Sequence, residues 1–175
     1  MNISARNVFR GKISALVDAA VNAEIELILA GGDKIVAIIT EESVKSLGLA
    51  VGMEALAYVK APWVMLLAGP ANMKFSARNQ LTGKVSQVTK GAVNSEVAIT
   101  LAGGTIVYAV VTNEAVLELG LKEGSEASAL IKASQVILGL PPDRCCWPIL
   151  AQALNGARGW PALWAKADFL AAQNA

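Results

Sequence analysis

The feature that most constrains the fold is an internal repeat. Residues 4–66 recur as residues 76–138 at a constant offset of 72 residues and without a gap, and about 30 of the 63 aligned positions are identical. The polar element Ser4-Ala5-Arg6-Asn7 returns as Ser76-Ala77-Arg78-Asn79. Two copies this alike must each be a complete folding unit. Whatever the repeated polar residues do, the chain does it at least twice.

The repeat predicts two domains, 1–68 and 74–141, followed by an extension, 142–175, that has no counterpart in the repeat and no assigned role. A unit of about 65 residues is near the size at which one core is marginal by itself. The chain is nevertheless 54% hydrophobic. We therefore expect each copy to share buried surface with the other copy or with other subunits, and the protein to be an oligomer.

Charge and composition exclude several classes of partner. The formal net charge is +1, whereas domains that bind nucleic acid usually carry a clear basic excess. The sequence therefore predicts no nucleic-acid partner, while a small dianion, which needs only a few aimed donors, stays compatible. There is no histidine and no spaced set of cysteines, so a site for a free metal cation is not expected.

The sequence indicates a cytoplasmic protein without a membrane partner. Its first residues, 1–6, have no apolar region typical of a signal peptide, and no stretch approaches the roughly 18 apolar residues of a membrane span. The two cysteines, Cys145 and Cys146, are adjacent, and neighbouring cysteines rarely form an unstrained bridge. A reducing compartment fits this usage.

Hydrophobic periodicity predicts an all-β fold with short helices. In the first copy we expect strands at 11–17, 22–30, 34–40, 54–60 and 63–67, with a two-turn helix at 40–48. Glycines and an Asp mark the hairpin between the second and third strands. Five strands with a helix between the third and fourth is the order of an OB-type barrel, so we expect tandem OB-like barrels. Residues 161–173 have the pattern of a short amphipathic helix.

No catalytic constellation is present, and we do not expect an enzyme or a catalytic cofactor. The sequence lacks a histidine base, a nucleophile elbow and a phosphate-binding loop. The repeated carboxylates Glu24 and Glu96 lie on strands of alternating polarity, where a solvated face is the better explanation.

The repeated polar residues form a set of hydrogen-bond donors. They are Ser4, Arg6, Asn7, Thr40 and Lys60, echoed by Ser76, Arg78, Asn79, Thr112 and Lys132. A tetrahedral oxyanion only accepts hydrogen bonds, so it calls for hydroxyls, amides, N–H groups and one or two cations. Simpler interpretations stay open: the threonines as helix N-caps, the lysines as strand ends that reach water, and the arginines as solvated turn residues.

Four motifs together resemble the Mop domain of the molbindins, which are small cytoplasmic proteins that bind molybdate and tungstate. The motifs are Ser-Ala-Arg-Asn, residues 91–97, residues 110–115 and residues 131–134, and the resemblance covers residues 2 to about 141. The same domain occurs in molybdate-responsive regulators and, in related form, in transport ATPases. The resemblance implies OB-like barrels, a homotrimer of two-module chains, and storage of molybdate or tungstate at sites between subunits.

Carried over by position, the resemblance implies that one module supplies the side chains of one site and a neighbouring subunit supplies a helix start. The implied residues are Ser4, Arg6, Asn7, Lys60 and Ala61 with Thr40 and Ser43, and in the second copy Ser76, Arg78, Asn79, Lys132 and Ala133 with Thr112 and Ala115. Ala115 replaces Ser43 and removes a hydroxyl. A second type of site would use the turns Ala20-Val21-Asn22 and Ala92-Val93-Asn94.

Two rival functions come from other classes. A molybdate-sensing regulatory module would need a DNA-binding or transporter partner in trans, since only three residues precede Ser4. An oligonucleotide-binding OB protein is disfavoured by the near-neutral charge and by a total of nine aromatic residues.

Overall fold

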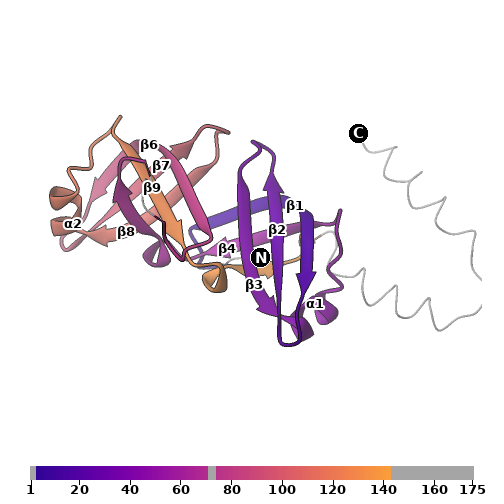
Figure 1. Cartoon of the computed structure of the whole chain (residues 1–175). Helices are drawn as coiled ribbons and strands as arrows, with labels where there is room; N and C mark the ends of the chain where they lie inside the picture. The colour runs from indigo at the N-terminus through magenta and orange to yellow at the C-terminus, as the bar shows by residue number, and fades with distance from the viewer. Residues whose placement is uncertain (1–2, 71–73, 143–175) are drawn as a thin grey trace, which may run out of the picture. The chain divides into compact units, whose positions relative to one another are not determined.

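The computed structural model describes residues 3–70 and 74–142, and most of its regular structure consists of β-strands (Figure 1). The first copy contains β1 (Asn7–Asp18), β2 (Asn22–Leu29), β3 (Lys34–Thr40), α1 (Glu41–Leu47), β4 (Glu54–Val59), the 3-10 turn η1 (Ala61–Trp63) and β5 (Met65–Ala68). The second copy contains β6 (Asn79–Lys90), β7 (Asn94–Leu101), β8 (Ile106–Thr112), α2 (Asn113–Glu118), β9 (Glu126–Ile131), η2 (Ala133–Gln135) and β10 (Ile137–Gly139).

Each sheet curls because its long first strand pairs on both sides. The first half of β1 pairs antiparallel with β4, and its second half pairs with β2. The two pairings overlap at Gly11, where an added Cβ would lie 2.9 Å from the carbonyl oxygen of Ile28. A register shift follows at Ser14, and Ser86 has the same shift in β6. A bulge bends a strand and increases its twist, so these features roll both sheets into half-barrels.

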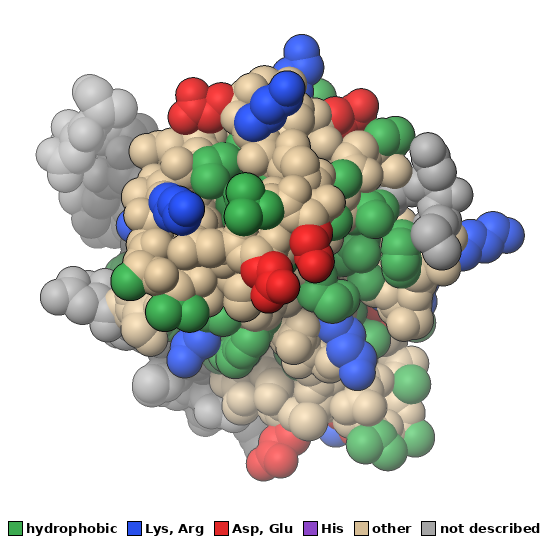
Figure 2. Space-filling view, turned by 90° about the vertical axis from the view of Figure 1, so that its left-hand side faces the viewer, with side chains coloured by type: hydrophobic (Ala, Val, Ile, Leu, Met, Phe, Trp, Pro, Cys, Tyr) green, Lys and Arg blue, Asp and Glu red, His purple; other side chains and the backbone are tan. Residues whose placement is uncertain are grey.

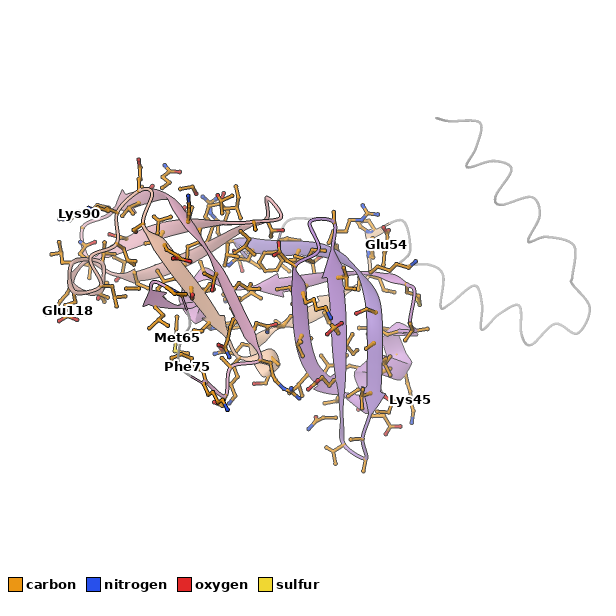
Figure 3. All side chains as sticks on the ribbon, turned by 45° about the horizontal axis from the view of Figure 1, so that its top comes forward. Lys45, Glu54, Met65, Phe75, Lys90 and Glu118 are labelled. Carbon is orange, nitrogen blue, oxygen red and sulfur yellow. The ribbon has the colours of Figure 1, made fainter. Side chains whose placement is uncertain are left out.

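The two copies exchange their last strands. β5, from the first copy, pairs with β9, and β10, from the second copy, pairs with β4. The strand orders are therefore β10-β4-β1-β2-β3 and β5-β9-β6-β7-β8. In Figure 3, Met65 of β5 lies with the strands of the second sheet, whereas Glu54 of β4 lies on the first. Neither five-stranded sheet is complete without a strand from the other copy, so the expectation that each copy is a complete folding unit was wrong.

The core follows the alternation of the strands and extends through both copies. On β2, Ala23, Ile25, Leu27 and Leu29 are buried, and the residues between them are more exposed. The buried apolar residues of both sheets belong to one continuous cluster. Shared buried surface between the copies, expected from their small size, is therefore confirmed.

The hairpin turns of the two copies touch through their backbones. A Cβ at Gly31 would collide with the carbonyl oxygen of Gly103, and a Cβ at Gly103 would collide with the carbonyl oxygen of Gly31. The next residues, Gly32 and Gly104, have φ values of 86° and 82°, which favour glycine. In each repeated Gly-Gly, the first glycine allows the two hairpin turns to approach closely, and the second adopts the positive φ that its turn requires.

The fold predicted from the sequence, tandem OB-like five-stranded units with one short helix each, is confirmed. The expected strand 34–40 matches β3, and the other strand ends shift by only a few residues, except that β1 begins earlier than predicted. The amphipathic helix expected at 161–173 falls outside the described residues. Among the described residues, no helix is long and apolar enough to cross a membrane.

Candidate functional site

The repeated arginines lie just before the first strand of each copy and bond to the opposite copy. Arg6 Nη2 donates to Glu96 Oε1 at 2.8 Å, and Arg78 Nη2 donates to Glu24 Oε2 at 2.6 Å. The Glu96 carboxylate raises the pKa of Arg6, first through this hydrogen bond and then through its charge. The two glutamates are therefore ion-pair partners, and their interpretation as a plain solvated face was incomplete.

The repeated asparagines hold the two copies together. Asn7 Nδ2 donates to the carbonyl oxygen of Tyr108 at 2.9 Å, and Asn7 Oδ1 accepts from Tyr108 N at 2.7 Å. Asn79 bonds in the same way to the N–H and carbonyl of Val36, at 2.6 and 2.9 Å. Both asparagines are 2% exposed. Each side-chain amide therefore bonds to the N–H and carbonyl of one residue of an edge strand, as a neighbouring strand would. Both the oxygen and the nitrogen of the amide have partners.

The repeated lysines stand beside the arginines at the end of β4 and β9. Asn7 pairs with Val59, and Asn79 with Ile131, so the arginine before each asparagine and the lysine after its partner lie at the same end of two paired strands. Lys60 and Lys132 are exposed, and neither forms an ion pair with any described residue.

The 3-10 turns that follow the lysines lie against the opposite copy. The turn η1 contacts β8, and η2 contacts β3. Ala61 and Ala133, which begin these turns, are buried. Ser4 and Ser76 are exposed and make no side-chain hydrogen bond with a described residue. We call Ser4, Arg6, Lys60 and Ala61 the first donor set, and Ser76, Arg78, Lys132 and Ala133 the second donor set.

The threonines at the helix starts are N-caps. Thr40 Oγ1 accepts from Ser43 N, and Thr112 Oγ1 accepts from Ala115 N, both at 3.1 Å. In the first copy Thr40 Oγ1 also lies 2.8 Å from Ser43 Oγ, so one of these two hydroxyl hydrogens is used between them. A hydroxyl carries one hydrogen. Each helix start therefore keeps one O–H donor, and the loss predicted from Ala115 does not change that number.

The turns expected to form a second type of site lie next to the helix starts. Glu41 N donates to the carbonyl oxygen of Val21 at 3.2 Å, and Asn113 N donates to that of Val93 at 3.0 Å. Both valines are among the most exposed large apolar residues described. The remaining members of the turns, Ala20, Asn22, Ala92 and Asn94, are exposed as well.

Within one chain, the structure brings each donor set to the opposite copy but keeps it away from that copy's helix start. Arg6 contacts Tyr108 in the middle of β8, and Thr112 ends this strand. Four residues of strand span roughly 13 Å. The expectation that another subunit supplies the helix start stays a prediction.

Charged side chains do not gather into a basic patch on the face shown in Figure 2, where Lys and Arg lie among acidic and apolar side chains. No cluster of His, Cys, Asp and Glu that could hold a metal ion occurs among the described residues.

Sequence reasoning did not place four neighbours of the candidate site there: Glu24 and Glu96, which were interpreted as a solvated face, and Trp63 and Tyr108. The repeat contained a signal for the glutamates, since both occur at the same offset as the arginines with which they pair. The aromatic residues gave no such signal, because neither is repeated.

The family of the chain follows from the match of each copy to a known domain. The TOBE domain matches residues 3–66 and 76–138, so the chain belongs to the TOBE domain family and carries the domain twice.

The relatives are molybdenum proteins by name. A solved structure of the cytoplasmic molybdate-binding protein ModG, with molybdate bound, is 57% identical with a TM-score of 0.77, covering 81% of this chain and 100% of that one. The molybdenum-pterin-binding protein MopA of Rhodobacter capsulatus is 44% identical over 141 residues, which are 81% of this chain. The molybdenum transport protein ModE of Herbaspirillum seropedicae is 40% identical over 143 residues, 82% of this chain. The chain spans 53% of the length of each of these two curated relatives.

Proposed function

We propose that this protein binds molybdate and tungstate reversibly, as a cytoplasmic storage and buffering protein without enzymatic activity. The observation that carries the proposal is repeated in both copies: an arginine and an exposed lysine without a described ion-pair partner lie at the same end of two paired strands. The similarity to a ModG structure described with molybdate bound supports the choice of oxyanion.

The donor sets have separate tasks in this mechanism. Lys60 and Lys132 supply net positive charge, because each arginine is already paired with a carboxylate. The guanidinium has five N–H donors in a plane, so each arginine keeps donors beyond the one given to its glutamate. The hydroxyls of Ser4 and Ser76 and the backbones of Ala61 and Ala133 add neutral donors.

We further propose that the site is completed in a homotrimer. A neighbouring subunit would bring the hydroxyl retained at Thr40–Ser43 or Thr112, and the adjacent turns at 20–22 and 92–94 would form the second type of site. We assign Asn7 and Asn79 to holding the two copies together and not to the ligand, since their amides are bonded to backbone.

Removal of both arginines tests this proposal. In calorimetric titration, wild-type protein is expected to bind molybdate and tungstate at saturable sites, with sulfate and phosphate much weaker. Arg6→Ala/Arg78→Ala should lower the affinity by about 1.5–3 kcal/mol per site, roughly 10- to 150-fold, because charge-assisted hydrogen bonds are lost. Native mass spectrometry should show that the variant keeps the subunit number of the wild type.

Arg10→Ala is the matched control. Arg10 is also exposed and donates to a carboxylate, Glu54, at 2.7 Å, but it lies outside both donor sets. The Arg10→Ala variant should bind molybdate with the affinity of the wild type. Unchanged molybdate binding in the double arginine variant would instead make the Ser-Ala-Arg-Asn element a structural turn.

A second candidate is a molybdate-sensing module that acts through a DNA-binding or transporter partner. It is favoured by the ModE relative, which is about twice as long as the match. In this case molybdate should change the affinity of the protein for such a partner, measured by sedimentation of the mixture with and without the anion.

A further inference from the structure

The two donor sets have the same polar residues but different aromatic surroundings. The Arg6 guanidinium carbon lies 4.7 Å from the centre of the Tyr108 ring, and Lys60 Nζ lies 5.7 Å from that of Trp63. The repeat places Val36 where Tyr108 stands and Gln135 where Trp63 stands. Both cations of the first donor set therefore rest on aromatic rings, whereas the equivalent positions of the second donor set have none.

The rest of the comparison is balanced between the two sets. Each arginine donates to one glutamate of the opposite copy, at 2.8 and 2.6 Å. The serines, lysines and alanines are identical, and each asparagine clamp makes the same bonds to its edge strand. Among the side chains that contact these cations, the aromatic residues are therefore what distinguishes the first donor set from the second.

Rings beneath the cations affect anion binding in two ways. A cation held over a ring loses less freedom when an anion binds, and such preorganisation raises affinity. The rings also exclude water from one side of each cation, and hydrogen bonds to charged groups are stronger where the local dielectric is low. Stacking covers the face of a guanidinium and leaves its N–H groups, which lie in the plane, directed outward.

We propose that Tyr108 and Trp63 make the first donor set the tighter oxyanion site, so that one chain binds molybdate with two affinities. This inference rests on the proposed function. Two exposed cation–π contacts predict a difference of roughly tenfold between the two classes of site. The tighter class would fill at low molybdate and the weaker class would buffer a higher range.

Exchange of the residues between the copies tests the inference in the full chain. Among the sites built on the donor sets, wild-type protein titrated calorimetrically with molybdate should show two classes in equal number, apart from any sites at the turns 20–22 and 92–94. Arg6→Ala should weaken the tight class alone, and Arg78→Ala the weak class alone. Trp63→Gln/Tyr108→Val should weaken the tight class about tenfold, so that both classes merge.

The reciprocal variant predicts a gain of affinity, which a variant that merely fails to fold cannot produce. Gln135→Trp/Val36→Tyr adds the rings to the second donor set and should tighten the weak class about tenfold. Trp63→Phe, which retains a ring, should keep most of the difference. Trp63 is the single tryptophan among the described residues, and its emission should change as the tight class fills.

The outcomes separate the inference from the proposed function. One class of molybdate site in the wild type, or two classes that neither aromatic exchange alters, would overturn the inference and leave molybdate binding intact. No molybdate binding by the wild type would refute the proposed function, and the inference with it.

Discussion

Replacement of Asn7 by alanine should loosen the junction between the two copies. The amide makes two short bonds, to Tyr108 N and to the Tyr108 carbonyl oxygen, and a longer one of 3.3 Å to the carbonyl oxygen of Val59. Asn7→Ala removes these bonds and leaves the Tyr108 backbone groups unpaired at a part-buried interface. A neutral hydrogen bond contributes about 0.5–1.5 kcal/mol, and an unsatisfied buried group costs about 1–3 kcal/mol. We therefore expect a loss of about 2–4 kcal/mol.

Urea unfolding at a fixed protein concentration measures this loss. With a slope of about 1–3 kcal/mol per molar urea for a small protein, the midpoint should fall by roughly 1–2 M or more, with the slope itself unchanged. Asn79→Ala should give a similar shift, because Asn79 makes the equivalent bonds to Val36. Gln80→Ala is the control, since Gln80 is an exposed amide with one local bond to the Ala77 carbonyl.

An unchanged midpoint for Asn7→Ala would refute the argument that the repeated asparagines join the copies. A shift in Asn7→Ala matched by one of equal size in Gln80→Ala would also count against it, because the loss would then not depend on the junction.

Two further predictions concern the backbone contact and the acid range. Gly31→Ala should destabilise the fold by about 1–3 kcal/mol in the same urea assay, because its Cβ meets the Gly103 carbonyl; an equal cost at an open loop position would contradict this. Ser14→Ala should lower the free energy of unfolding at neutral pH and do so progressively less in acid. The Ser14 hydroxyl, and then Lys34, lowers the pKa of Glu26 in the folded state. The stability from the Ser14–Glu26 bond is therefore present above the ordinary glutamate pKa and is lost as the pH falls through the lowered pKa. Ser86→Ala, at the same bulge without that carboxylate, should show no such pH dependence.

The sequence contained most of the local structure. Alternating apolar residues on 22–30 and 34–40 predicted β2 and β3, and the threonine, acidic residues and glycine of 40–48 predicted α1 with its caps. These signals are local, because a side chain's face and a cap depend on neighbours within a few residues. They repeat in the second copy, so each element was supported twice.

The strand exchange could not be read from the sequence. β5 and β10 end equivalent segments of the repeat, so either strand satisfies the same apolar pattern beside β4 or β9. The choice depends on where the connection between the copies leads, which is a property of the whole fold. For the same reason the sequence grouped Asn7 with the anion donors, although its partner is the backbone of Tyr108, in the opposite copy.

The ion pairs between the two copies determine the charge of each donor set. Because Glu96 pairs with Arg6 across the junction, the first set carries the net charge of Lys60 alone, and the second set is balanced in the same way by Glu24. One positive charge does not neutralise the proposed dianion, so the proposed site depends on aimed neutral donors for the rest of the stabilisation. A site of this kind discriminates by the positions of its N–H and O–H groups, since a purely cationic patch attracts any anion of equal charge. Under the proposed function, the carboxylate that weakens the electrostatic attraction would favour selectivity and release, which are the properties that buffering of molybdate requires.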